Sequence, residues 1–306
     1  MICFRLPKSS VCAEFFKSYK MCQVSRYTWT KLSVSISCSE TEEMLIRRRQ
    51  RLQPLINKLR ISTVEKGVAE VNQRMFKKHR VKQASEILET ANELFDGKLA
   101  IAFSGGKDSL VAIHLAMKVN PKLPVVFSST TVEFPETLSF VRDLARNWNF
   151  DLRVVSPKKS FFRMVTDKGV WASHEDRWCC RPCKEDPTVD LLVKEDLQAE
   201  ITGTTRTESL YRRSLAPIKM PKKEPYLIRV NPIYDWNQQE VWSYIHLYNL
   251  PVNPLYGKGY RRIGCWCCPL NGPSHFTRVK STHPMLYKFL RDFTPRHPAL
   301  VRKKIK

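Results

Sequence analysis

Residues 102–110 read Ala-Phe-Ser-Gly-Gly-Lys-Asp-Ser-Leu, and this stretch decides the fold. An apolar run at 99–103 leads into it and an apolar helical pattern follows from Leu110 to Val119. The pattern predicts a strand, a glycine-rich turn and a helix. Such a turn presents backbone N–H groups at a helix N-terminus, where an anion such as phosphate binds. The spacing is neither that of a Walker A loop nor that of a dinucleotide fingerprint.

The residue types of this turn suit an anion site. Gly105 and Gly106 permit close backbone approaches that a Cβ would block. Lys107 adds a mobile positive charge. Ser104 and Ser109 can cap the helix or bond a phosphate oxygen. An ordinary tight turn also contains Gly-Gly and Ser, but Lys-Asp-Ser between a strand and a helix favours the anion site.

Strand and helix patterns alternate after this turn. Apolar runs predict strands at 124–128, 152–155 and 200–203, and helical patterns predict helices at 136–148, 160–165 and around 191–193. Repeated β-α-β units predict an α/β fold: a Rossmann-like, doubly wound, mostly parallel sheet with helices on both faces. Ligands of such sheets bind outside the carboxyl ends of the strands, where the Gly-Gly turn lies. Further patterns predict an extended segment at 227–233 and helices at 236–248 and 284–293.

The flanking regions differ from this alternating part in pattern and charge. Residues 1–40 lack clear periodicity, and we expect a poorly ordered extension there. Residues 41–97 form an N-terminal helical region that ends at a turn signal. We expect a nucleotide-binding domain at 98–290, with a basic loop at 217–225, and a basic, frayed tail at 291–306.

The charge balance favours anionic partners. The 306 residues carry a net charge of +23, and the first 82 contain 18 Lys and Arg against six Asp and Glu. Nucleotides and nucleic acid are the expected partners, although a solvated basic surface is equally compatible. No apolar run approaches the length of a transmembrane helix, so we expect no membrane span and a cytoplasmic location.

Six of the ten cysteines form two tight groups, at 179–183 and 265–268. No convincing secretory signal is present, so we interpret these groups as an intracellular metal site rather than as disulfides. Thiolates select zinc or an iron–sulfur cluster. Structural zinc pairs are usually separated by two to four residues, and the adjacent Cys179-Cys180 therefore favours a [4Fe-4S] cluster, with zinc as the alternative. Basic residues flank the thiols: Arg177, Arg181, Lys184, Arg261 and Arg262.

With these residues in view, the chain resembles the phosphoadenosine phosphosulfate (PAPS) and adenosine phosphosulfate (APS) reductase family in its iron–sulfur form. That family belongs to the PP-loop, or adenine nucleotide alpha-hydrolase, superfamily. The resemblance runs from about 98 to 290 and rests on five motifs in the family's order. They are Ser-Gly-Gly-Lys-Asp-Ser at 104–109, Glu-Phe-Pro-Glu-Thr at 133–137, Cys-Cys at 179–180 with Lys184, Glu-Ser-Leu-Tyr-Arg at 208–212, and Asn-Pro-Leu-Tyr at 253–256 running on to Cys-Pro at 268–269.

The resemblance implies a role for each matched residue. The nucleotide site would include Ser104, Gly105, Gly106, Lys107, Asp108, Ser109, Glu133, Arg206 and Arg212. The cluster ligands would be Cys179, Cys180, Cys265 and Cys268. Lys184 and Arg212 would face sulfate or phosphate groups and are the candidate catalytic residues. The implied reaction is reductive sulfur transfer from PAPS or APS, which gives sulfite and needs an electron donor.

Three departures from the family's pattern stand out. Members carry a catalytic cysteine in a C-terminal Glu-Cys-Gly-Leu-His tail, whereas this sequence has no cysteine after Cys268. Cys183 and Cys267 are additional thiols, and each would serve as a nucleophile, as a replacement ligand or as neither. The family's Asp-Thr-Gly is Ser-Thr-Thr at 129–131, and its Gly-x-Arg is Gly-Thr-Thr at 203–205, with Arg206 one place late.

These features leave two other hypotheses beside the reductase. One is an ATP-dependent sulfurtransferase acting on tRNA or another nucleic acid, which the basic N-terminal third favours. The other is a non-catalytic nucleotide- or nucleic-acid-binding module with a structural metal.

Overall fold

The computed structural model describes residues 73–173, 175–209, 212–220 and 227–293. The expected extension at 1–40, the helical region at 41–72 and residues 294–306 of the expected tail lie outside this part, as does 221–226 of the expected basic loop. In the described part, no helix is both long enough and apolar enough to cross a lipid bilayer.

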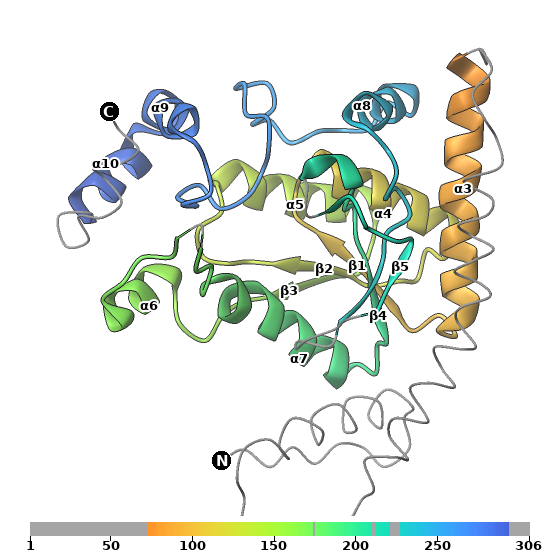
Figure 1. Ribbon diagram of the computed structural model, residues 1–306, viewed down its shortest axis with the longest axis horizontal. Coiled ribbons are helices and arrows are strands. Elements are labelled where there is room, and N and C mark those ends of the chain that lie inside the picture. The colour runs from red at the N-terminus through yellow and green to blue at the C-terminus, as the bar shows by residue number, and fades with distance from the viewer. Residues whose placement is uncertain (1–72, 174, 210–211, 221–226, 294–306) are drawn as a thin grey trace, which may run out of the picture.

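A six-stranded sheet lies at the centre of the molecule, with strand order β3-β2-β1-β4-β6-β5 (Figure 1). All neighbours pair in parallel except β5 and β6, which are antiparallel. From β1 the chain moves outward through β2 to β3, and it then returns to β4 on the other side of β1, so the order reverses between β1 and β4. Beyond β4 the chain forms the edge strand β5 first, and β6 lies between β4 and β5. The strands are β1 (Leu99–Phe103), β2 (Val125–Ser128), β3 (Leu152–Val155), β4 (Ala199–Ile201), β5 (Ile218–Lys219) and β6 (Ile228–Val230). The doubly wound prediction is confirmed.

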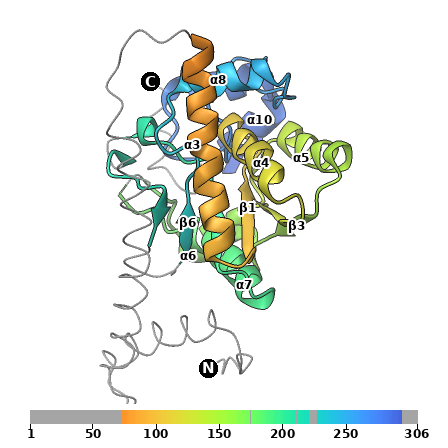
Figure 2. The ribbon, with the colours of Figure 1, turned by 90° about the vertical axis from the view of Figure 1, so that its right-hand side faces the viewer.

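Helices cover both faces of this sheet. On one face, α4 packs against β1, α3 and α8 (Figures 1 and 2). On the other face, α7 packs against β2 and β3. The helices are α3 (Gln73–Leu94), α4 (Lys107–Val119), α5 (Pro135–Trp148), α6 (Phe161–Lys168), α7 (Asp186–Lys194), α8 (Gln238–Leu247), α9 (Pro273–Thr282) and α10 (Pro284–Phe293). A π-helical turn, η1, spans Arg181–Glu185, and a 3-10 turn, η2, spans Arg206–Glu208.

The apolar residues form separate clusters. The largest lies between the sheet and α3, α4, α5 and α8, and it includes Ile87, Leu110, Val125 and Ile245. The described part of the expected N-terminal helical region therefore shares the core of the nucleotide-binding domain. A second, aromatic-rich cluster gathers residues of α6, α9 and α10 around the two cysteine groups. We call this second region the thiol region.

Three local features differ from the sequence expectation. Ile218–Lys219 forms the edge strand β5 inside the expected basic loop. Helix α9 lies where the sequence predicts no element, because only Phe276 and Val279 give it a buried apolar face. The N-cap of α4 is Gly106, which makes no side-chain capping bond, so neither Ser104 nor Ser109 caps this helix.

Candidate nucleotide and thiol site

The turn at 104–109, which we call the phosphate turn, is fixed by contacts with the surrounding fold. Gly105 has φ of +73°, and a Cβ there would lie 2.7 Å from the Thr137 Cγ2 atom, so only glycine fits. The Asn253 side chain is 1% exposed. It donates to the Gly105 carbonyl at 3.2 Å and to the Thr137 hydroxyl at 3.1 Å. The Leu255 N–H in turn donates to the Asn253 amide oxygen at 3.0 Å.

Ser104 and Ser109 brace this turn from inside. The Ser109 hydroxyl donates to the Gly106 carbonyl at 2.9 Å and accepts from the Ser104 N–H at 3.3 Å. The two hydroxyl oxygens are 3.0 Å apart. Because the Ser109 proton points to the carbonyl, the Ser104 hydroxyl is the donor of this pair. Ser104 is exposed and Ser109 is buried, so only Ser104 offers its oxygen at the surface.

Lys107 and Asp108 form a close ion pair at the first turn of α4. The Lys107 ammonium lies 2.6 Å from the Asp108 Oδ2 atom, and the Lys107 side chain is only 4% exposed. Its backbone N–H donates to the Tyr256 hydroxyl at 2.8 Å. Burial raises the pKa of Asp108 although the Lys107 charge opposes the shift. The Asp108 Oδ1 atom is buried with no hydrogen-bond partner among the described residues.

Gly203, directly after β4, allows two chain segments to touch. A Cβ at this position would lie 2.4 Å from the Asp108 carbonyl carbon and oxygen and 2.5 Å from the Ser109 nitrogen. The glycine therefore lets the segment after β4 lie against the start of α4, at the point where the strand order reverses. Ligands bind at such points in doubly wound sheets.

Glu208 forms ion pairs with two arginines near the phosphate turn. Its carboxylate lies 2.5 Å from the Arg212 guanidinium and 3.3 Å from that of Arg262. The Glu208 charge contributes to the raised pKa values of Asp108 and Tyr256, which places it near both side chains. The structure therefore brings together residues from three of the five motifs.

Arg206 occupies a different environment from Arg212. Its guanidinium donates to the Leu215 carbonyl at 2.8 Å and to Asp235 at 3.4 Å, and it lies 4.6 Å from the centre of the Tyr234 ring. Asp235 also binds Arg80 of α3 at 2.9 Å. The structure thus places Arg206 in a network with α3 and the β6–α8 connection rather than against the phosphate turn.

Glu133 lies beside the thiols. Its carboxylate accepts hydrogen bonds from the N–H and hydroxyl of Thr130, the former at 2.9 Å. The same Thr130 hydroxyl is 3.4 Å from the Cys265 sulfur. Thr131 has φ of +71°, a left-handed conformation that favours glycine, and this is the position where the family's pattern has glycine.

The segment 253–268 connects the phosphate turn to the thiol region. Ile263 lies 3.9 Å from the position of a Cβ on Gly106. The N–H of Trp266, the residue after Cys265, donates to the Val132 carbonyl at 2.9 Å. The segment therefore places Cys265 between the turn after β2 and the phosphate turn.

The thiols interact with one another across the two groups. The Cys179 thiol donates to Cys180, and this bond, together with Arg177 and Lys184, lowers the pKa of Cys180 to about 6 against the effect of burial. The same bond raises the pKa of Cys179. Burial and the nearby Cys265 raise the pKa of Cys183 to about 12.

Cys265 and Cys267 also favour the protonated form. Burial raises the pKa of Cys265 to about 11, while the Thr130 hydroxyl and the Lys184 charge act in the opposite direction. Burial raises the pKa of Cys267 well above its usual value. Cys183 and Cys267 are 3% and 1% exposed, so both additional thiols belong to the packed thiol region.

The donor set fits a thiolate-bound inorganic group in its chemistry. Cys179, Cys180, Cys265 and Cys268 supply four soft sulfur donors, and Arg177 and Lys184 stabilise thiolates next to them. Within the described ranges, no group of three or more His, Cys, Asp or Glu side chains is arranged to hold a metal ion.

Comparisons with known proteins agree with this architecture. A family model described as the phosphoadenosine phosphosulfate reductase domain matches residues 98–271. An adenosine 5'-phosphosulfate reductase of Bacillus cereus is 31% identical over 192 residues, which are 62% of this chain and 80% of that protein. An uncharacterised protein of Methanocaldococcus jannaschii is 38% identical over 186 residues, or 61% of this chain, and the match spans only 45% of that protein.

A solved structure has the same fold. The PAPS reductase from Candida auris, in a phosphate complex, superposes with a TM-score of 0.51 at 24% identity, covering 66% of this chain and 99% of that chain. The matched region contains the phosphate turn, both cysteine groups and the Glu208 cluster. The chain therefore belongs to the phosphoadenosine phosphosulfate reductase domain family.

Proposed function

We propose that this protein is an iron–sulfur sulfonucleotide reductase, which transfers electrons to the sulfur of an adenylylated sulfate and releases sulfite. One observation carries the proposal: the segment 253–268 brings the phosphate turn, the Glu208 cluster and the thiols to one edge of the sheet. Family membership supports the reaction class, and the APS reductases among the relatives support an adenosine phosphosulfate substrate.

The chain's own side chains would bind and orient the substrate. The N–H groups after Gly105 and the start of α4 favour a phosphate. Arg212 and Arg262 would exchange Glu208 for oxygens of the sulfate or phosphate, since a guanidinium binds either oxyanion through paired N–H donors. Lys184, on η1 among the thiols, would add a third cation on the side of the sulfur.

Four cysteines would hold a [4Fe-4S] cluster: Cys179, Cys180, Cys265 and Cys268. When bound, the cluster supplies an electron-exchanging centre whose potential depends on the surrounding charges and hydrogen bonds. Arg177 and Lys184 would offset the negative charge of the thiolates. Zinc is the alternative occupant, and the two are distinguished by colour.

The proposed reaction breaks the bond between the sulfate sulfur and the oxygen that bridges it to phosphorus. Two electrons from a dithiol reductant reduce the sulfur, the dithiol becomes a disulfide and its two protons pass to water. The sulfur leaves as sulfite, and the bridging oxygen stays on the adenosine phosphate. Cys183 and Cys267 are buried with raised pKa values, so we assign the electrons to an external donor of the cytoplasm.

Anaerobic reconstitution tests this proposal. Loaded protein should be brown, absorb near ~400 nm, and form sulfite from APS or PAPS with a dithiol. Cys265→Ser should lose the colour and the activity, whereas Cys267→Ala, at a thiol outside the proposed ligand set, should keep the colour. An intact cluster that yields no sulfite from either nucleotide would refute the reductase.

A second candidate is an ATP-dependent sulfurtransferase that acts on tRNA. The net charge of +23 and the basic excess within the first 82 residues favour a nucleic-acid partner. This candidate requires conversion of ATP to AMP in the presence of tRNA, and tRNA binding that weakens steeply with salt. Sulfite formation without tRNA would favour the reductase instead.

A further inference from the structure

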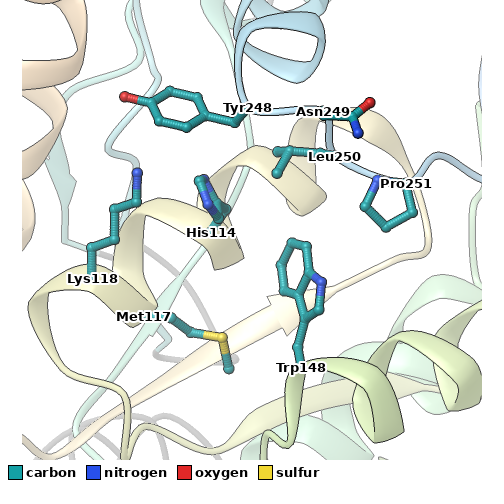
Figure 3. A pocket seen from close by; sticks show the side chains of 8 residues that line it. All are labelled: His114, Met117, Lys118, Trp148, Tyr248, Asn249, Leu250 and Pro251. Carbon is teal, nitrogen blue, oxygen red and sulfur yellow. The ribbon is translucent and has the colours of Figure 1, made fainter.

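A pocket of about 420 Å³ lies on the helical layer of the molecule, between the second half of α4, the end of α5 and the turn after α8 (Figure 3). His114, Lys118, Trp148, Tyr248, Leu250 and Pro251 are among its lining residues. His114 follows Lys107 by seven residues, or roughly 10 Å along the helix axis. No residue of the phosphate turn lines the pocket, so it is a separate place in the fold.

Three rings define the shape of this pocket. The His114 ring centre lies 5.7 Å from that of Trp148 and 5.1 Å from that of Tyr248. Figure 3 shows His114 between Tyr248 on one side and Trp148 on the other. A hydrogen bond of 2.8 Å between the His114 Nδ1 atom and the Tyr244 hydroxyl fixes the central ring. His114 therefore packs against both outer rings, tilted by 51° and 58°, and the three rings form one aromatic lining.

The pocket combines neutral rings with one cation. Burial and the neighbouring Lys118 charge lower the pKa of His114 to about 4, so its ring is uncharged at neutral pH. The Lys118 ammonium lies 3.9 Å from the centre of the Tyr248 ring. Leu250 and Pro251 complete an apolar wall. The lining thus offers stacking surfaces beside a single positive charge.

We propose that this pocket binds a nucleobase whose phosphate contacts Lys118, taken from a free mononucleotide or from an unpaired position of a single-stranded nucleic acid. A planar ring stacks on aromatic side chains, whereas an aliphatic chain gains only burial. The volume falls within the range of small-ligand pockets and accommodates a base with its sugar. The net charge of +23 draws polyanions to the molecule.

Binding measurements with pocket variants test this proposal. The probes are a fluorescein-labelled single-stranded RNA decamer, followed by anisotropy, and uridine 5'-monophosphate, followed by calorimetry. Trp148→Ala should weaken binding of the bound probe about 10-fold or more, because stacking on one ring has an effect of this size. Trp148→Phe should restore most of the affinity. Lys118→Gln should weaken binding and reduce its salt dependence, whereas Lys122→Gln, exposed just beyond α4, is the matched control.

The two sources of the base give different results. If the mononucleotide binds and Trp148→Ala weakens it, the pocket takes a free nucleotide; if only the decamer does so, it takes a nucleic acid. Probe binding that depends on Trp148 is read without any cluster or sulfite formation, and sulfite formation that depends on Cys265 is read without these probes, so failure of the reductase proposal and failure of this one are distinguishable.

A cross-linking experiment gives the location independently of affinity. A decamer with 5-iodouridine, irradiated on the protein, should attach to peptides that contain Trp148 or Tyr248. Cross-links confined to other peptides, or equal affinities of wild type, Trp148→Ala and Lys118→Gln for both probes, would overturn the proposal.

Discussion

The phosphate turn and the thiol region lie side by side but are stabilised in different ways. Around the turn, the Asn253 amide and the Tyr256 hydroxyl bond to backbone groups at 3.2 and 2.8 Å, and Gly203 permits a backbone-to-backbone contact. In the thiol region, aromatic side chains pack around sulfur atoms whose pKa values are mostly raised. The turn is formed by contacts within the fold, whereas most thiols, Cys180 excepted, favour the protonated form.

This difference indicates which part of the site needs a ligand to reach its functional conformation. The turn has its conformation without one, because its hydrogen-bond partners belong to the same chain. The thiols repel one another as thiolates, so the proposed positively charged inorganic group would be needed to hold several of them deprotonated together. We therefore expect backbone substitutions to damage the turn most, and loss of a bound group to affect the thiol region most.

The largest expected effect is at Gly203. In Gly203→Ala the added Cβ would meet backbone atoms of Asp108 and Ser109 at 2.4–2.5 Å, and backbone moves less easily than a side chain. We expect a loss of about 3 kcal/mol in the free energy of unfolding, measured with denaturant. Gly264→Ala is the matched control, because nothing lies within 4 Å of its Cβ, and it should change little. Equal effects at both positions would contradict the close contact.

Asn253→Ala should have the next largest effect. The substitution removes two donated bonds and leaves the buried Leu255 N–H without its acceptor. We expect a loss of about 2 kcal/mol. Thr137→Val, which removes only one of these partners, should lose about half as much. A neutral Asn253→Ala would show that the turn does not depend on this side chain.

The thiols should differ in their rates of alkylation in metal-free protein. Only the thiolate reacts, and the pKa of Cys180 is lowered, whereas burial raises the pKa values of Cys183 and Cys265, so Cys180 has the largest thiolate fraction of the three. The lower nucleophilicity of a low-pKa thiolate offsets part of this advantage, so we expect Cys180 to react about 10-fold faster in iodoacetamide pulses read by mass spectrometry. The rates should converge in denaturant. Faster alkylation of Cys183 than of Cys180 would contradict the buried position of the Cys183 thiol.

The smallest effect concerns the ion-pair cluster that joins Glu136 of α5 to Lys258 and to His283, the residue after α9. Burial raises the pKa of Glu136, but hydrogen bonds from Lys258 and His283 outweigh it, and the net shift is downward. The carboxylate therefore stabilises the folded state above its unfolded pKa, and this stabilisation is lost as pH falls through the folded pKa. Glu136→Gln should cost about 1 kcal/mol at pH 7, and the difference from wild type should shrink as pH falls through the lowered folded pKa of Glu136. A difference that does not change with pH would contradict this assignment.

The sequence predicts the phosphate turn better than it predicts the thiol region. The strand, turn and helix at 99–119 follow from local patterns, and the structure confirms them. The contact of Asn253 with Gly105 joins residues 148 apart, and no local pattern contains it. Glu133 carries a family motif that implies a nucleotide contact, whereas its position beside Thr130 and Cys265 depends on packing between distant segments.

Gly203 and Tyr256 both lie in family motifs, but the motifs do not indicate what these residues contact. The family's Gly-x-Arg pattern marks Gly203, but only the fold shows that its missing Cβ makes room for the first turn of α4. Tyr256 lies within the Asn-Pro-Leu-Tyr motif, and the motif does not indicate that its hydroxyl accepts the Lys107 N–H. Arg206 matches its motif one place late, and its bonds to Leu215 and Asp235 follow from that shifted position.

The separation of the two cysteine groups along the chain has a consequence for biosynthesis. Cys180 and Cys265 are 85 positions apart. A ribosome adds about 5–20 residues per second, so Cys179 and Cys180 are made roughly 4–17 s before their partners. Strands β4, β5 and β6 are synthesised in this interval. During it Cys179 and Cys180 have Cys183 and basic residues near them in the chain but not the second cysteine group, and they are then most open to oxidation. Insertion of the proposed inorganic group would have to wait until Cys265 and Cys268 are made.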